Sequence, residues 1–157
     1  MSIYEEIRKD HDHHRKLLSQ IADTSGDSAA RNTAWRTFYC DVKSHAAAEE
    51  ETFYSKLMSK TWGQDAARHS VHEHQQLDDL MEELNDTDMS SPGWLTKFKQ
   101  LKHDYEHHMD EEENEVFTRA REVIDGAEVE GYGKRFRARK AEERKLVDEK
   151  VADSLED

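Results

Sequence analysis

The sequence predicts an all-α protein, an antiparallel up-and-down four-helix bundle followed by a C-terminal helical extension. Apolar side chains recur at alternating steps of three and four residues, which is the spacing of one helix face, and no segment alternates like a half-buried strand. The few glycines and the single proline separate these segments and mark turns. The first half of the chain also maps onto the second half at a constant offset of 63 residues. These observations favour two similar helical hairpins packed about a pseudo-twofold axis.

The turn signals divide the chain into five helices. We expect them at roughly 2–22, 28–59, 63–85, 92–125 and 131–150. Ser91 followed by Pro92 predicts a capped start for the fourth helix, because serine is a good N-cap and proline suits the first helical position. The bundle should therefore occupy residues 1–125, and a charged helix and tail should occupy residues 126–157.

Size and composition limit the function classes. A chain of 157 residues is about one domain, and a net charge of −13 without a basic face argues against a nucleic-acid partner. The basic run at 134–140 is followed by two glutamates, so we expect a solvated helix there. A single cysteine excludes a disulfide framework and a cysteine-based zinc site. No signal segment or membrane-length apolar run is present, so we expect a cytoplasmic protein without a membrane partner.

Polar residues interrupt the apolar stripe at the middle of each of the first four helices. In chain order they are His11 and His14, His45 and Glu49, Ser70 and His74, and His108 and Glu112. The aromatic members of these stripes, Trp35, Phe38, Phe98 and Tyr105, are expected in the core. A buried carboxylate without a partner costs several kcal/mol, unless a cation neutralises it or it takes up a proton. The stripes therefore predict metal ions in the core.

The internal repeat and the His-x-x-x-Glu spacing select the same residues. At the offset of 63, His11 corresponds to His74, His45 to His108, Glu49 to Glu112, Glu50 to Glu113 and Tyr54 to Phe117. Residues four apart lie on one helical face and can share a metal ion. The expected ligands are His11, His45, Glu49, His74, His108 and Glu112.

Two further pairs show the same spacing. His69 with Glu73, and His107 with Glu111, lie off the core stripes, and the repeat does not match either histidine to another histidine. We expect both pairs to be solvated.

The motifs HAAAEEETFY and HMDEEENEVF, together with the Asp-His and Glu-His pairs at 10–11 and 73–74, resemble the hemerythrin-like, or HHE cation-binding, domains over residues 3–124. The resemblance implies a four-helix bundle with two non-haem iron ions and an oxo or hydroxo bridge. It further implies that Glu49 and Glu112 bridge the irons, with His11 and His108 on one iron and His45 and His74 on the other. Histidine precedes glutamate in these motifs, unlike the Glu-x-x-His of ferritin-like bundles.

One departure from oxygen-carrying hemerythrins bears on function. Those proteins have a further histidine four residues from the one on the third helix, where this chain has Ser70 and Asp78. Open metal positions then favour binding or turnover of O2, peroxide or NO. An enzyme of this kind would be a catalase- or peroxidase-like, or NO-handling, diiron oxidoreductase, with no catalytic residue beyond the ligands.

Two alternatives stay open. The first is non-catalytic O2 or iron sensing or storage, with Val129, Tyr132 and Phe136 of the last helix as an output surface for a protein partner or self-association. The second is a structural Zn or Mn site, because histidine and carboxylate ligands do not select iron uniquely.

The residues beside the expected ligands have less defined roles. His14 is an extra ligand, a hydrogen-bond donor to a ligand, or a satisfied core histidine. Tyr54 lies nine residues after His45, about half a turn off the ligand face, so packing is favoured. Asp10, Glu73, Glu50 and Glu113 could accept hydrogen bonds from the ligands, but exposed helix carboxylates are the favoured interpretation.

Overall fold

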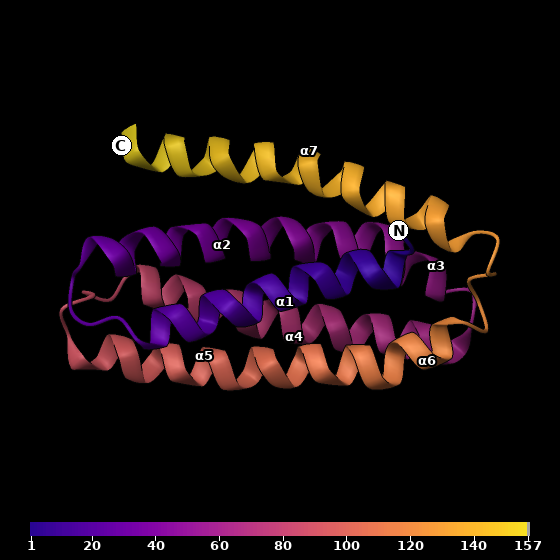
Figure 1. Ribbon diagram of the computed structural model, residues 1–157, viewed down its shortest axis with the longest axis horizontal. Helices are drawn as coiled ribbons and strands as arrows, with labels where there is room; N and C mark the ends of the chain where they lie inside the picture. The colour runs from indigo at the N-terminus through magenta and orange to yellow at the C-terminus, as the bar shows by residue number, and fades with distance from the viewer. Residues whose placement is uncertain (157) are drawn as a thin grey trace.

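The computed structural model describes residues 1–156 and consists of helices joined by short turns (Figure 1). The long helices are α1 (Ile3–Ala22), α2 (Ala29–Glu49), α4 (Thr61–Asn85), α5 (Pro92–Glu111) and α7 (Val129–Glu156). Short segments continue α2 and α5: the π-helix η1 (Glu50–Tyr54) with α3 (Ser55–Leu57), and the π-helix η2 (Glu112–Val116) with α6 (Phe117–Ala120). Over these residues there is no strand, which confirms the all-α prediction. None of the helices described is long and apolar enough to cross a membrane.

Serine caps fix the starts of three long helices. The side chains of Ser2, Ser28 and Ser91 accept hydrogen bonds from backbone N–H groups of the first turns of α1, α2 and α5. Pro92 occupies the first helical position of α5, as predicted. α4 starts two residues earlier than predicted. Gly63 lies inside its first turn, where a Cβ would meet the Leu57 carbonyl oxygen at 1.7 Å, so this glycine serves close packing rather than the turn.

Two hydrophobic clusters fill the interior, and a polar layer separates them. One cluster contains the predicted core aromatics Trp35, Phe38, Phe98 and Tyr105, each at most 4% exposed. The other contains Phe53, Phe117 and Phe136, with residues from the start of α1. Between the clusters lie the histidines and glutamates that interrupt the stripes. The polar layer therefore has one apolar cluster on each side.

The C-terminal helix α7 packs along α1 and α2 (Figure 1). Phe136 is fully buried, and Val129 and Tyr132 pack partly buried against the second cluster. These three residues therefore contact the bundle, and a partner of the C-terminal helix stays a prediction. The basic run is not simply solvated, because Arg137 pairs with Glu6 and Lys140 pairs with Asp10 and Asp41. Acidic side chains on α1 and α2 attract this face of α7.

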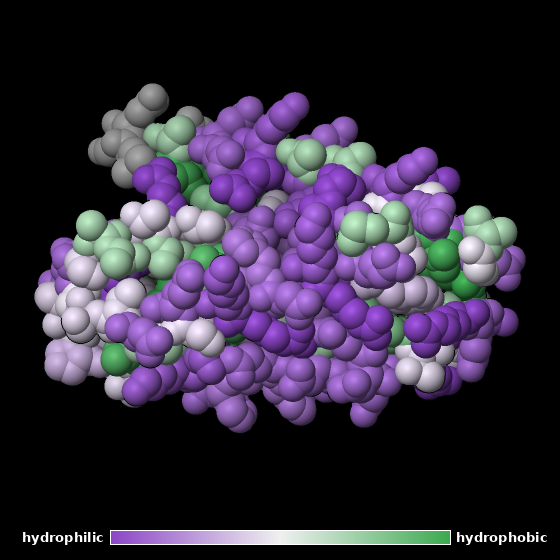
Figure 2. Space-filling view, viewed as in Figure 1, coloured by the Kyte–Doolittle hydropathy of each residue, from purple (hydrophilic) through white to green (hydrophobic). Residues whose placement is uncertain are grey.

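The surface seen in Figure 2 is largely hydrophilic, with apolar side chains showing mainly toward the two ends. This pattern agrees with a mean hydropathy of −1.10 and with 38% charged residues. The view from this side offers no large apolar face to a membrane or to an obligate partner.

Candidate metal centre

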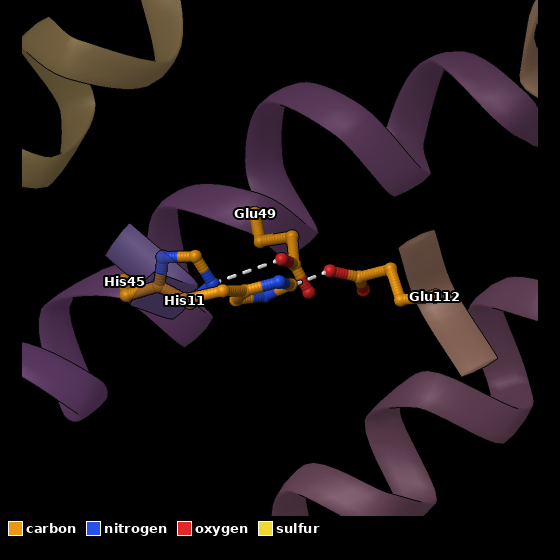
Figure 3. Close-up of side chains that lie close together, drawn as sticks. All are labelled: His11, His45, Glu49 and Glu112. Carbon is orange, nitrogen blue, oxygen red and sulfur yellow. Dashed lines mark hydrogen bonds and ion pairs between the residues drawn. The ribbon is translucent and has the colours of Figure 1, made fainter. Parts of the chain in front are cut away.

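The polar layer contains all six predicted ligands. Each helix of the two hairpins contributes: His11 from α1, His45 and Glu49 from α2, His74 from α4, His108 from α5, and Glu112 from η2. The His74 side chain is 10% exposed, and the other five residues are at most 3% exposed. Figure 3 shows four of these side chains pointing toward one another from facing helices.

Each glutamate lies between two histidines. The two carboxylate oxygens of Glu49 lie 3.0 Å from Nε2 of His45 and 3.4 Å from Nε2 of His74. The two oxygens of Glu112 lie 3.2 Å from Nε2 of His11 and 3.8 Å from Nε2 of His108. This arrangement is suited to a carboxylate that bridges two cations, one per oxygen.

The ligand atoms form two groups that share Glu49. Atoms of His11, His45, Glu49 and Glu112 lie within 4.8 Å of one another, and so do atoms of Glu49, His74 and His108. The pairing implied by the resemblance, His11 with His108 and His45 with His74, is therefore wrong.

The hairpin geometry explains the observed grouping. His11 and His45 are equidistant from the α1–α2 turn, as His74 and His108 are from the α4–α5 turn, so each pair is level in its own hairpin. The imidazole centroids are 5.2 Å apart in the first pair and 5.0 Å apart in the second.

Three buried atoms at this centre make no hydrogen bond: Nε2 of His11, Oε1 of Glu49 and Oε1 of Glu112. A buried polar atom without a partner costs free energy, and a buried carboxylate costs more than a neutral group. One cation in each of the two ligand groups would give all three atoms a partner. Imidazole and carboxylate donors also match the preferences of divalent first-row metals, so the residues fit such ions.

A ring of carboxylates holds the other ring nitrogen of each of the four histidines of the centre. Each Nδ1 lies 2.8–2.9 Å from a carboxylate oxygen on the next helix around the bundle. The pairs are His45 with Asp10, His74 with Glu50, His108 with Glu73, and His11 with Glu113. The interpretation of these four acids as merely exposed carboxylates is thus wrong. Each is adjacent in sequence to an expected ligand, and the four obey the repeat. They orient the rings so that each Nε2 faces the centre.

The acidic surroundings shift the histidine pKa values of the metal-free chain. Burial lowers the pKa of His45, but Glu49 and Asp10 outweigh it and raise this pKa to about 9. Burial likewise opposes protonation of His74, but Glu49 and Glu50 raise its pKa to about 10. Without metal, protonated histidines therefore supply the positive charge that the glutamates require.

The π-helical segments change the position of Tyr54. Because a π-turn contains an extra residue, it rotates the residues after Glu49 by about 100° relative to a regular helix. The hydroxyl of Tyr54 consequently donates a hydrogen bond to Oε2 of Glu112 at 2.5 Å, so the packing-only interpretation is wrong. Burial and the negative charge of Glu112 raise the pKa of Tyr54 well above its usual value, which keeps the proton on this hydroxyl. Apolar periodicity contains no signal for this insertion.

His14 lies beside His45, with 5.2 Å between the ring centroids, but both of its ring nitrogens have partners outside the ligand groups. Nδ1 accepts from the hydroxyl of Tyr105 at 2.7 Å, and Nε2 donates to Asp41 at 2.5 Å. Burial lowers the pKa of His14 to about 4, so the ring is neutral near pH 7. Of the three roles considered, this placement matches the satisfied core histidine. Sequence reasoning missed Asp41, which also pairs with Lys140 of α7.

A pocket of about 270 Å³ connects the centre with the surface between α4 and α5. Tyr54, Ser70, His108 and Glu112 are among its lining residues. Ser70, one of the two positions considered for the further histidine of the oxygen carriers, thus lines the approach to the centre. Asp78, the other position considered, instead pairs with Lys43 at 2.6 Å.

Comparison with known proteins agrees with this fold. The family model described as Hemerythrin HHE cation binding domain matches residues 2–120. A Hemerythrin HHE cation binding domain-containing protein from Mycobacterium kansasii has a similar structure, with a TM-score of 0.82 and 27% identity, over 93% of this chain and 89% of that one.

A curated relative from Nostoc sp. strain PCC 7120, named DNA nickase, is 26% identical over 141 residues. The matched region is 90% of this chain but 40% of that protein, so the chain spans less than half of that relative. The match of the family model to residues 2–120, together with the His and Glu cluster, shows that this chain belongs to the hemerythrin HHE cation-binding domain family.

Proposed function

We propose that the centre holds two non-haem iron ions bridged by Glu49 and Glu112, and that the protein binds or turns over small oxygen or nitrogen species there. Peroxide, O2 and NO are the candidates. The observation that carries the proposal is the pair of ligand groups sharing Glu49, with three buried ligand atoms left without hydrogen bonds. When bound, such a diiron centre, with the oxo or hydroxo bridge that the family resemblance implies, supplies one-electron and two-electron redox chemistry.

The chain's own residues would prepare this site. The four outer carboxylates keep each Nε2 directed inward, and the two bridging glutamates offset the positive charge of the ions. The Tyr54 hydroxyl holds a proton beside Glu112, within reach of the pocket. With two histidines at each position and no further histidine at Ser70, room is left for a small exogenous molecule.

Metal analysis combined with a peroxide assay tests the proposal. We expect protein purified without added metal to contain about two iron ions per chain, to show an oxo-bridged absorption near the ultraviolet edge, and to consume peroxide. His45→Ala should lose the iron, the band and the peroxide consumption. His103→Ala is the matched control, because His103 is 81% exposed on α5. Protein that contains zinc or manganese and does not bind iron would overturn the proposal.

A binding role without turnover is the second candidate. The contact of α7 with His45, through Phe136, favours it, because this contact would let a change at the centre reach the C-terminal helix. Reversible O2 spectra without peroxide loss would support sensing or storage over turnover. A nicking function is not proposed, because a net charge of −13 opposes approach to a phosphate backbone.

A further inference from the structure

Two surface pairs that are separate in the sequence meet in the structure. Nε2 of His69 lies 3.2 Å from Oε1 of Glu73 on α4 and 3.0 Å from Oε1 of Glu111 on α5. His107 adds a fourth group, with Nε2 at 3.4 Å from Oε2 of Glu111. The two histidines are 54% and 69% exposed, as expected from the sequence, but the acids are only 19% and 27% exposed. The two predicted solvated pairs therefore form one mixed histidine and carboxylate cluster.

The spacing of this cluster is compatible with a metal site. One ligand atom each from His69, Glu73 and Glu111 lies within 4.8 Å of the other two. Three protein donors leave the remaining coordination positions to water, and because the His69 side chain is 54% exposed we expect the ion to exchange with solvent. A site of this kind suits an ion in transit better than a stored one.

The cluster lines the same pocket as the buried centre. His69, Glu73 and Glu111 share it with His108 and Glu112, which belong to the inner ligands. Glu112 is 1% exposed, and its Oε1 makes no hydrogen bond and lies 3.2 Å from Nε2 of His11, so this carboxylate offers a cation a buried oxygen on the inner side. This atom is an observation independent of the surface cluster.

The charge in the pocket favours cations. Its lining contains five acids, namely Asp65, Glu73, Glu111, Glu112 and Glu115, against one basic residue, Arg119. The guanidinium of Arg119 stacks over the ring of Trp62, 4.5 Å from its centroid. A concave region lined mainly by one sign of charge raises the local concentration of oppositely charged ions.

Glu73 links the surface cluster to the centre. Its Oε1 accepts a hydrogen bond from Nδ1 of His108 at 2.8 Å, and the same oxygen is the one that faces His69. A cation held by His69 and Glu73 is thus one residue away from a ligand of the inner site.

We propose that His69, Glu73 and Glu111, with His107 beside them, form an outer site for a divalent transition-metal cation, from which the ion passes through the pocket into the buried centre. The destination of the ion rests on the proposed function. The outer site itself rests on the surface cluster and the pocket.

Two measurements on the whole chain in metal-free form test this proposal. The first titrates Zn2+ by calorimetry, since zinc is redox-inert and accepts the same donors. We expect two tightly bound ions and a third, weaker one. The second follows the rate of Fe2+ loading by stopped-flow absorbance. The double variant His69→Ala/His107→Ala should lose only the third ion and should load at least about tenfold more slowly, with the same final iron content.

Matched variants separate site loss from misfolding. His103→Ala removes an exposed histidine from the same helix as His107 and should load at the wild-type rate. Glu111→Gln keeps the side-chain volume and should reproduce the slow loading of the double variant. A wild-type protein without a third ion, or a double variant that loads at the wild-type rate, would overturn the outer site. A single weak ion that the double variant loses would instead support the outer site and contradict the diiron centre.

Discussion

Phe136 of α7 packs edge-on against the imidazole of His45, with 5.4 Å between the ring centroids. Phe136 is fully buried, and on the same face of α7 Lys140 lies 3.0 Å from Asp10, the acid that holds Nδ1 of His45. The C-terminal helix therefore covers the candidate metal centre on the side of α1 and α2. The surroundings of His45 depend on a helix outside the two hairpins.

Truncating this contact should be costly. Phe136→Ala removes a buried ring between α7 and the bundle, so we expect the free energy of unfolding to fall by about 3–5 kcal/mol. Denaturant titration measures this loss. Leu146→Ala on the same helix is the control, because Leu146 is 50% exposed and its loss should change stability by less than about 0.5 kcal/mol. Equal effects of the two variants would mean that α7 does not dock on the bundle as described.

Three consecutive glutamates should differ sharply in their effect on metal binding. Glu49→Gln removes the shared bridging carboxylate, so we expect it to abolish tight binding at both positions. Glu50→Gln weakens only the hydrogen bond to His74 and should lower metal affinity by about 10–100-fold. Glu51→Gln changes an exposed side chain and should leave affinity unchanged. Zn2+ titration of the metal-free variants measures all three, and a loss of affinity in Glu51→Gln would contradict the assignment.

The sequence predicted the six centre residues because their positions depend only on helix periodicity and the repeat. The four histidines lie on the apolar stripes of their helices at equivalent heights: His11, His45, His74 and His108. In a regular α-helix, the spacing of residues in the sequence determines which of them share a face. Because the two histidines of each hairpin are level, the sequence also indicated the observed grouping of His11 with His45 and of His74 with His108. The pairing implied by the resemblance did not use this information.

Other features needed the three-dimensional structure. The π-turn at η1 inserts a residue into the helical register, so counting from His45 placed Tyr54 on the wrong side. Lys140 meets Asp10 and Asp41 across 99 residues or more, and no local spacing predicts such a contact. The repeat could have identified the outer carboxylates, because it matches Asp10 to Glu73 and Glu50 to Glu113. They were interpreted as exposed because charged residues on helices usually are.

Removing the partly buried ammonium of Lys140 should destabilise the protein in a pH-dependent way. Lys140→Met leaves Asp10 and Asp41 without the ammonium that lies 3.0 Å from an oxygen of each, so we expect a loss of about 3–5 kcal/mol at pH 7. Burial opposes ionisation of Asp10, but His45 and Lys140 outweigh it and lower its pKa to about 2. A depressed pKa adds stability above the unfolded value of 3.8, and this stability is lost as the pH falls toward 2.

The penalty of Lys140→Met should accordingly shrink below about pH 4, where protonation relieves the carboxylates. Urea titrations at pH 7 and pH 3.5 check both values. Lys145→Met, at an exposed position of the same helix, should show neither effect. A penalty that grows on acidification would contradict the pairing.

The metal-free protein should lose stability as the pH rises above neutrality. The folded pKa values of His45 and His74, about 9 and about 10, exceed the unfolded value of 6.5. Their contribution is therefore fully present below about pH 6.5 and is lost as the pH rises through 9 to 10. In this window the free energy of unfolding should fall by up to about 1.4 kcal/mol per pH unit for each histidine protonated only in the folded chain.

Bound metal should remove this loss and reverse the trend. An ion displaces the proton from each histidine, so its apparent affinity rises with pH until the histidines are neutral. Denaturation at pH 6.5, 8 and 9.5, with and without Zn2+, measures both slopes. His74→Ala should flatten the metal-free slope, because one raised pKa is gone, whereas His103→Ala should keep it. If stability of the metal-free protein instead increased between pH 6.5 and 9.5, the histidines would not carry the positive charge that Glu49 and Glu112 require in the absence of metal.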